Sequence, residues 1–438
     1  MATSASTPLP ELAEQALSLM RRQGFDQAQV DASERRHTEL NLALNEPSLL
    51  RSGHSHKMAL VGMLGGRRAS TELAELSGPA LADAVTLLWT AVQSAPQDDA
   101  NAVSSGQQLQ LRQGPLPEPG DDPHALAGTA ADAMADLRAW RSEHTPTVMI
   151  DEAYAAHVEL HCHTLTSAGS CLASTLGWYE LSVMAAAHED RQTSSFNHCG
   201  GNCHALAGQP VADLFGIGDM LRDLTEQVHT IPSPGKFSGE LVLHPAAVTD
   251  LLGWLLGQLA DQALISGSSL YAQRLGQEMA SPLLTLHSRF DAPGMAAVSA
   301  DAFIAPALTL LQQGRLMALT PSLYASRKTG LAHQPVAAEG WALQAGDTPR
   351  AGLVAAVHKG ALVGRLSMGR PAANGDFSGL LKNSFAIENG QRGAALREVM
   401  VSGNVAQMLR AVRAVSTERI DTASWLLPWL RIDGLDFC

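Results

Sequence analysis

The stretch that decides the fold is Asn374-Gly375-Asp376-Phe377-Ser378-Gly379, which runs on to a second glycine turn at Asn389-Gly390. An Asn-Gly pair between two strand-like runs is a strong signal for a two-residue hairpin turn. Gly375 and Gly379 in the first stretch would let the backbone approach a cleft closely. We therefore predict β-hairpins in this region. The first turn either borders a substrate cleft or is a plain structural loop.

The rest of the C-terminal half is also rich in strand-like runs. A second turn, at Gln312-Gln313-Gly314, predicts another hairpin. We therefore expect residues 236–438 to form a large, mostly antiparallel β domain with a few helices. The predicted strands are Gly239–His244, Pro282–His287, Ala307–Leu311, Arg315–Thr320 and Leu380–Glu388.

The first 96 residues predict a smaller domain of helix, strands and helix. Apolar residues recur at helical spacing from Leu9 to Met20, and Gly24 would end that helix. A second apolar helix is predicted over Leu81–Val92. Between the two helices, the predicted strands are Gln27–Ala32, Thr38–Leu44 and Lys57–Met63.

Residues 97–123 are rich in Gln, Pro, Gly and Asp and are predicted to be a linker. Residues 124–235 would extend the N-terminal domain, and the whole chain is expected to be α+β. The predicted elements of this middle region are a helix at Ala125–Trp140, strands at Ala156–Leu165 and Trp178–Ala186, a polar loop at His188–Pro210 and a helix at Ala212–Val228.

Composition describes a globular protein of more than one domain. The chain has 438 residues, 45% of them hydrophobic and 17% charged, and its formal net charge is −13. An acidic chain without Lys/Arg clusters is not expected to bind nucleic acid. The most apolar helix candidate, Leu251–Ile265, is shorter than the roughly 20 residues of a membrane span. The N-terminus has no export signal, and five cysteines suit a reducing cytoplasm.

Two groups of His and Cys residues offer ligand types that zinc accepts. The first is His198-Cys199-Gly-Gly-Asn-Cys203-His204, in the polar loop, where a flexible reduced loop is the alternative. The second is His157-Val-Glu159-Leu-His161-Cys-His163. A strand would place its histidines and Glu159 on one face, as a metal site or as an ordinary polar face.

The order and spacing of the C-terminal motifs resemble the TldD/PmbA family, in particular its PmbA-like (TldE-like) branch. The segments that carry the resemblance are Gly239–Pro245, Ala280–Leu286, Gly375–Gly390, Glu398–Asn404 and Pro428–Leu435. The resemblance extends over nearly the whole chain and departs mainly in the histidine-containing middle section and around Pro335–Asp347. It implies a peptide-cleaving zinc enzyme made of two different subunits.

The family's metal motif, a helix with His-Glu-x-x-x-His, is missing from this sequence. In the resemblance, Gly253, Trp254 and Gln258 stand where the first His, the Glu and the second His would be. Glycine and indole cannot bind zinc, and glutamine is a poor ligand. We therefore expect no catalytic residue and no cofactor in this chain, with the zinc held by a TldD-like partner subunit.

The resemblance implies a non-catalytic subunit of a cytoplasmic heterodimeric metalloprotease that cleaves unfolded peptides. Removal of the leader from a ribosomally made peptide natural product is one such reaction. The residues expected at the substrate cleft are Gly375, Asp376, Phe377, Ser378 and Gly379. Two alternatives remain: a self-sufficient metallohydrolase that uses one of the His/Cys groups, and a homodimeric peptide-binding scaffold.

Overall fold

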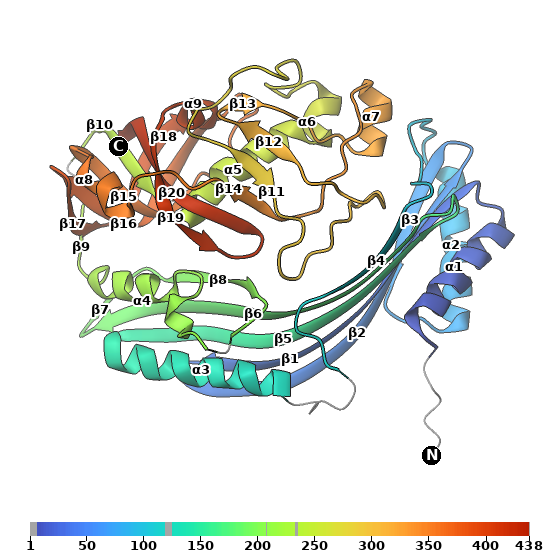
Figure 1. Ribbon diagram of the computed structural model, residues 1–438, viewed down its shortest axis with the longest axis horizontal. Coiled ribbons are helices and arrows are strands. Elements are labelled where there is room, and N and C mark those ends of the chain that lie inside the picture. The colour runs from blue at the N-terminus through green and yellow to red at the C-terminus, as the bar shows by residue number, and fades with distance from the viewer. Residues whose placement is uncertain (1–6, 119–124, 207, 233–234, 438) are drawn as a thin grey trace.

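The computed structural model describes residues 7–118, 125–206, 208–232 and 235–437. It contains two β-sheets packed as layers (Figure 1), with N-terminal helices and strands followed by a larger β-rich C-terminal part. The predicted α+β class is confirmed. Part of the predicted linker, residues 119–123, and the terminal residues 1–6 and 438 lie outside the described residues.

The first sheet is formed by eight strands in the order β3-β2-β1-β5-β6-β4, with β7 and β8 also paired to β6. Its four long strands run antiparallel, whereas β4 runs parallel to β6. The strands are β1 Gln27–Ala43, β2 Glu46–Leu64, β3 Arg67–Leu73, β4 Gln108–Gln113, β5 Val148–Thr166, β6 Cys171–Glu189, β7 Gln192–Thr193 and β8 Asn197–Cys203.

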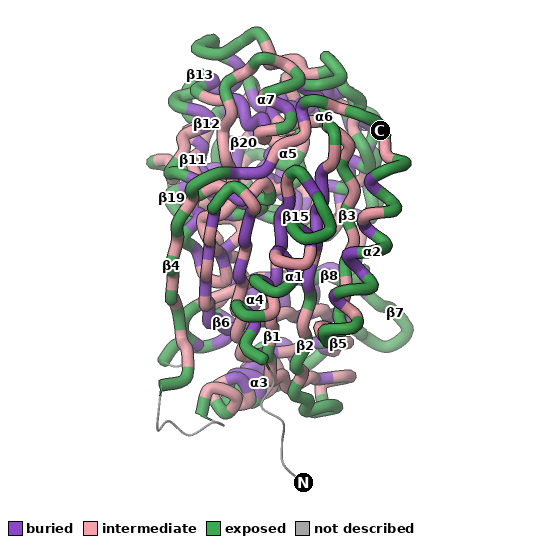
Figure 2. Tube along the Cα trace, turned by 90° about the vertical axis from the view of Figure 1, so that its right-hand side faces the viewer, coloured by how far each residue is buried: buried purple, intermediate pink, exposed green. Residues whose placement is uncertain are grey.

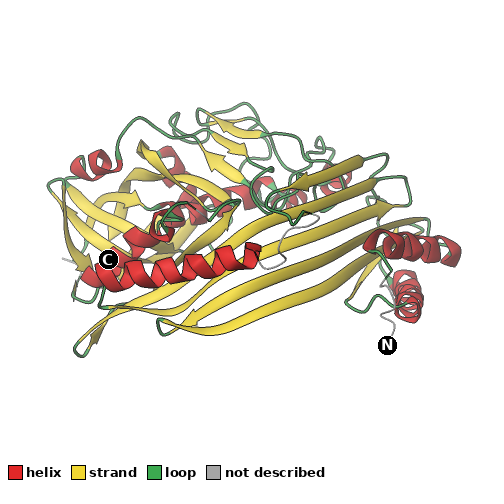
Figure 3. Ribbon diagram, turned by 60° about the horizontal axis from the view of Figure 1, so that its bottom comes forward, coloured by secondary structure: helices red, strands yellow, loops and turns green. Residues whose placement is uncertain are grey.

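Three helices cover one face of this sheet, α1 Leu9–Gln23 and α2 Gly78–Ser94 at one end and α3 Ala125–His144 at the other (Figure 3). Alternate residues of β1 explain the arrangement. Val30 and Ala32 pack into the α1–α2 core, and Leu40 packs against the α3 core. Gly24 ends α1 in the left-handed conformation, with φ of +104°, as predicted. Residues 33–39 lie between the two helical caps.

Two sequence-based assignments in this sheet were wrong. The predicted strands Gln27–Ala32 and Thr38–Leu44 are parts of one continuous strand, β1, because its pairing with β5 runs unbroken across the polar residues between them. Residues 108–113, within the predicted linker, form β4, because alternate side chains of this polar segment are half-buried at the edge of β6.

The second sheet has twelve strands in the order β13-β12-β11-β14-β20-β10-β15-β16-β17-β9, and β18 and β19 pair beside β20. Both predicted glycine hairpins are present, since β16 pairs with β17 and β12 with β13. The strands are β9 Thr230–Ile231, β10 Phe237–Leu243, β11 Leu286–Ser288, β12 Thr309–Gln312, β13 Arg315–Leu316, β14 Trp341–Leu343, β15 Lys359–Ser367, β16 Asp376–Glu388, β17 Gln391–Leu396, β18 Val399–Asn404, β19 Val412–Asp421 and β20 Trp425–Phe437.

Helix α5 is the main helix of the C-terminal core. The buried stretches gather along the middle of the molecule and the exposed ones along its outline (Figure 2). Val248, Leu251, Leu255 and Leu259 form the buried stripe of α5 against the sheet. The remaining helical segments are η1 Val211–Asp213, α4 Ile217–Glu226, α5 Pro245–Leu259, α6 Asp261–Ser266, α7 Leu323–Thr329, α8 Arg350–Ala355 and α9 Val405–Arg410. Within the described ranges, the helices are too short or too polar to span a lipid bilayer.

Candidate functional site

The three positions at which the sequence resemblance predicts the missing metal motif lie on α5. Gly253 is exposed, Trp254 is half-buried and Gln258 is buried. The indole nitrogen of Trp254 donates a hydrogen bond to the carbonyl oxygen of Ala372 at 3.3 Å. The amide of Gln258 donates to the carbonyl oxygen of Ala373 at 3.2 Å and accepts from the backbone N–H of Leu270 at 2.9 Å.

These residues do not fit a zinc ion. Gly253 has no side chain, and the indole of Trp254 is a donor without a lone pair for a metal. Both polar atoms of Gln258 are already bonded to backbone groups. The helix therefore holds neighbouring segments together at the place where the motif would bind metal.

The five predicted cleft residues begin beside this helix. A Cβ added to Gly375 would lie 3.2 Å from the Cζ2 atom of Trp254 and 3.2 Å from Oδ1 of Asn404. The carboxylate of Asp376 accepts hydrogen bonds from the amides of Asn374 and Asn404, both at 2.7 Å. These two hydrogen bonds, from Asn404 and Asn374, lower the pKa of Asp376. The turn is thus rigidly held.

The other three cleft residues lie in β16. Ser378 is exposed, whereas Phe377 and Gly379 are buried. None of the five lines the two cavities between the sheets that are described next. Their role at a substrate cleft stays a prediction.

The larger cavity, about 890 Å³, separates the inner face of the first sheet from the C-terminal part. Strand β3, at the edge of the first sheet, borders it, and so do residues 260–262, 299–301 and 320–324 of the opposite wall. Asp31 lies on the floor, where burial raises the pKa of its carboxyl group. At one side of the cavity the carboxylate of Asp98 joins the two walls, since it contacts Lys328 at 2.9 Å and Tyr324 at 2.8 Å.

A second cavity, about 290 Å³, lies at the N-terminal end of α5. Its ionisable groups include Asp219, paired with Arg350 at 2.6 Å, and the half-buried His244. Burial, together with the charge of Arg350, lowers the pKa of His244 to about 4. Burial raises the pKa of Asp223 to about 6, although Arg392 contacts this carboxylate at 2.7 Å.

The prediction of a loop over His198–His204 was wrong, because residues 197–203 form β8 on the edge of β6. Cys199 and Cys203 lie on one face of β8 and pack against the α3–α4 core. Four residues of strand place them about 13 Å apart, too far for one ion. Burial raises the pKa of Cys199 to about 12 and that of Cys203 to about 11.

The strand predicted over His157–His163 is part of β5. His157 bonds to the carbonyl oxygen of Pro115 at 2.8 Å, and His161 contacts Glu159 at 2.5 Å. On this strand face, Glu159 and His161 therefore contact each other, whereas His157 is held by the backbone of Pro115.

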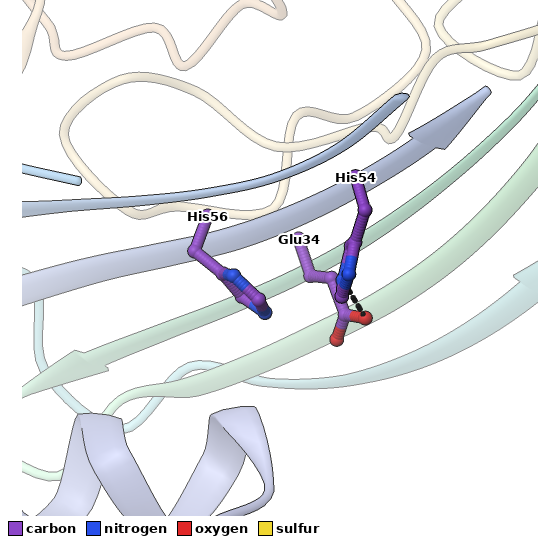
Figure 4. A group of neighbouring side chains, drawn as sticks. All are labelled: Glu34, His54 and His56. Atoms are coloured by element: carbon purple, nitrogen blue, oxygen red, sulfur yellow. Dashed lines mark hydrogen bonds and ion pairs between the residues drawn. The ribbon is translucent and has the colours of Figure 1, made fainter. Parts of the chain in front are cut away.

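Among the residues that the structure describes, the group able to place three ligand atoms within 4.8 Å of one another is Glu34, His54 and His56 (Figure 4). The sequence analysis missed it, since it placed all three residues outside strands. The alternating His-Ser-His at 54–56 was the available signal, but only the strand register brings Glu34 beside it.

Comparison with known proteins relates the C-terminal part of the chain to a metallopeptidase family. Residues 235–438 match the family model described as the PmbA/TldA metallopeptidase C-terminal domain. A comparison of the sequence with curated proteins found no match. The family-model match relates these C-terminal residues to the TldD/PmbA family.

Solved structures share the fold over almost the full length. TldE from Thermococcus kodakarensis is 15% identical, with a TM-score of 0.81 over 98% of this chain and 100% of that chain. A protein described as a modulator of DNA gyrase from Bacteroides thetaiotaomicron is 20% identical, with a TM-score of 0.81 over 98% of both chains. A Thermotoga maritima protein with the same description is 15% identical, with a TM-score of 0.75 over 98% of this chain and 99% of that chain.

Proposed function

We propose that this chain is the non-catalytic, TldE-like subunit of a heterodimeric metalloprotease whose zinc is held by a TldD-like partner. The observation that carries the proposal is the α5 helix. Its three motif positions are Gly253, Trp254 and Gln258, and the two side chains bond to backbone carbonyl groups near residue 372. A site that cleaves peptides with zinc needs ligands, an open coordination position and a base. The helix supplies none of these.

The proposed substrate is an unfolded peptide, such as a leader segment removed from a ribosomally made natural product. The larger inter-sheet cavity, of about 890 Å³, supports this part of the proposal, since it is bordered by the edge strand β3. An edge strand offers unpaired backbone groups to an extended peptide, which can add as a further strand with little demand on its sequence. Ser70 and Glu72 of β3 would face such a peptide.

We further propose that the complex works in the cytoplasm. The cysteines in the described part of the chain, Cys162, Cys171, Cys199 and Cys203, are all free thiols. Free thiols are stable in a reducing compartment.

The experiment compares three samples: this chain alone, a TldD-like partner with a His-Glu-x-x-x-His helix alone, and the two mixed. We expect the mixture to cleave an unfolded peptide and to elute as a heterodimer in size-exclusion chromatography with light scattering. Replacing the two histidines of the partner's motif should abolish cleavage. Cys203→Ser in this chain should leave cleavage by the mixture within about twofold, because Cys203 packs into a core.

Two results would overturn the proposal. One is zinc-dependent cleavage by the isolated chain that is lost in His198→Ala or Cys203→Ser, which would favour a self-sufficient metallohydrolase. The other is a stable homodimer that binds peptide and ignores the zinc-bearing partner, which would favour a scaffold protein.

A further inference from the structure

Three side chains with metal-binding atoms project from two neighbouring strands of the first sheet (Figure 4). Glu34 on β1 stands directly opposite His56 on β2, and His54 is two residues before His56 on the same face. Directly opposed residues have Cβ atoms about 4.5–5.5 Å apart. The strand register therefore brings the three together, whatever the surrounding loops do.

The group lies on the helix-covered face of the sheet, in the gap between the helical caps. Ala32 and Leu40 point to the same side as Glu34 and pack against the α1–α2 and α3 cores. The opposite face meets the C-terminal part, as the contact of Gln29 with the carbonyl oxygen of Ala300 shows. The group is thus separated from the inter-sheet cavities by the thickness of the sheet.

The distances are close to those of a coordinated ion. The Nε2 atom of His54 lies 2.7 Å from Oε1 of Glu34, and the rings of His54 and His56 are 4.5 Å apart between centroids. The three ligand atoms lie within 4.8 Å of one another. Around a zinc ion with bonds of about 2.0–2.2 Å, neighbouring ligand atoms lie roughly 3.3–3.5 Å apart. Small rotations of the His54 and His56 imidazoles, which are exposed and half-buried respectively, would bring the ligand atoms to the spacing found around zinc.

Arg36 is the one cation bonded to the group in the described residues, and its Nε atom donates to Oε1 of Glu34 at 2.8 Å. The bond orients the carboxylate, as outer partners of metal ligands commonly do. Its positive charge opposes a second cation, so the affinity should be lower than that of a fully thiolate site.

We propose that Glu34, His54 and His56 form a binding site for Zn²⁺ that ties β1 to β2 on the outer face of the first sheet. Two imidazoles and one carboxylate are a ligand set that zinc accepts while it keeps a position open. Glu34 also borders a surface hollow of about 580 Å³, together with Arg112 and His161.

The test is isothermal titration of the chelator-treated full chain with Zn²⁺ at pH 7.5, in parallel with thermal unfolding. We expect one stoichiometric ion, and a melting temperature that rises with zinc because only the folded chain holds the site. His56→Ala and His54→Ala should each weaken binding by at least about tenfold and abolish the zinc-dependent rise, since even outer partners contribute 10- to 100-fold. Mg²⁺ should not bind, because it prefers oxygen ligands.

His229→Ala is the matched control. His229 contacts the carboxylate of Glu189 at 2.8 Å on the surface, but within the described residues no second histidine completes a three-ligand group there. Zinc binding should be unchanged in this variant. Circular dichroism without zinc checks that every variant is folded.

Absence of stoichiometric zinc binding by the wild-type chain would overturn the proposal. Equal zinc binding by wild type, His54→Ala and His56→Ala would also overturn it and would reveal adventitious surface binding. The readout needs no peptide cleavage, so this proposal and the proposed function can fail separately. Loss of zinc binding in His56→Ala tests the site on the outer face. Loss of zinc-dependent cleavage in Cys203→Ser would instead test the proposed function.

Discussion

The side-chain amide of Gln258 bonds to the backbone of Ala373, 115 residues further along the chain, with an N···O distance of 3.2 Å. The same amide accepts a bond from the backbone of Leu270. Gln258 thus joins α5 to the turn before β16 and to the segment after α6. The sequence resemblance predicts a metal ligand at this position in the zinc-bearing branch, whereas the Gln258 side chain is structural in this chain.

We predict that Gln258→Ala lowers the free energy of unfolding by about 1–3 kcal/mol, because it removes the two hydrogen bonds of a buried side chain, each worth roughly 0.5–1.5 kcal/mol. Urea denaturation measures the change. The control is Gln262→Ala, on the exposed side of α6, which should stay within about 0.5 kcal/mol of wild type. Equal stability of the two variants would show that the bonds of Gln258 do not hold the turn.

Gly375 should not tolerate a side chain. Its φ is +92°, and an added Cβ would press against Trp254 and Asn404 at 3.2 Å. Gly375→Ala should therefore cost more than the roughly 1 kcal/mol of a left-handed alanine alone. Gly369→Ala provides the comparison, because φ there is +60° and no atom lies within 4 Å of the added Cβ. Similar unfolding midpoints for the two variants would contradict the prediction.

Acid should destabilise the protein through His244. Burial lowers the pKa of this imidazole to about 4 in the folded chain, below the ordinary value of 6.5. The unfolded chain therefore binds the proton first, and stability is lost as the pH falls from about 6.5 to about 4. The expected loss is on the order of 3 kcal/mol.

The measurement is the urea midpoint across this pH range for wild type and His244→Asn. Asparagine keeps an acceptor for the Ala246 N–H, which His244 caps at 3.1 Å, but does not titrate. Asp223, with its raised pKa, contributes the opposite slope in both proteins and cancels in the comparison. Parallel curves for the two proteins would rule out His244 as the source of acid sensitivity.

The thiols of β8 should react slowly in the folded protein. Burial raises the pKa of Cys203 to about 11 and of Cys199 to about 12, and the thiolate is the reactive form. At pH 8 we expect alkylation by iodoacetamide to be at least about a hundredfold slower than in urea. Peptide mass spectrometry reports each cysteine separately. Fast labelling of Cys203 in the folded chain would contradict this prediction and would favour the alternative in which the His198–His204 group is reactive.

Glycine signals and apolar periodicity predicted much of the fold. The Asn389-Gly390 and Gln312–Gly314 turns depend on local backbone conformation, and the helices around Leu17 and Leu88 depend on a regular apolar stripe. These features are contained in a few consecutive residues. They can therefore be identified without knowledge of distant neighbours.

Contacts between strands were not predictable in the same way. Residues 33–39 of β1 are polar because they lie between the helical caps, so the sequence suggests a break where the strand continues. The same error hid Glu34 and, on the next strand, His54 and His56. Cys199 and Cys203 seemed to lie in a loop, since only their pairing with β6 reveals a strand.

Strand β3 has one side without a neighbouring strand in the described sheet, apart from a single bridge between Arg67 and Gln97. Such a border can nucleate stacking between copies of the same protein and lead to insoluble assemblies. The chain counters this hazard with adjacent arginines, Arg67 and Arg68, and with Glu72, whose charges discourage like molecules from docking. The opposite wall of the inter-sheet cavity also restricts access to the free edge of β3. A single extended peptide would therefore reach this edge more easily than a second folded copy of the chain.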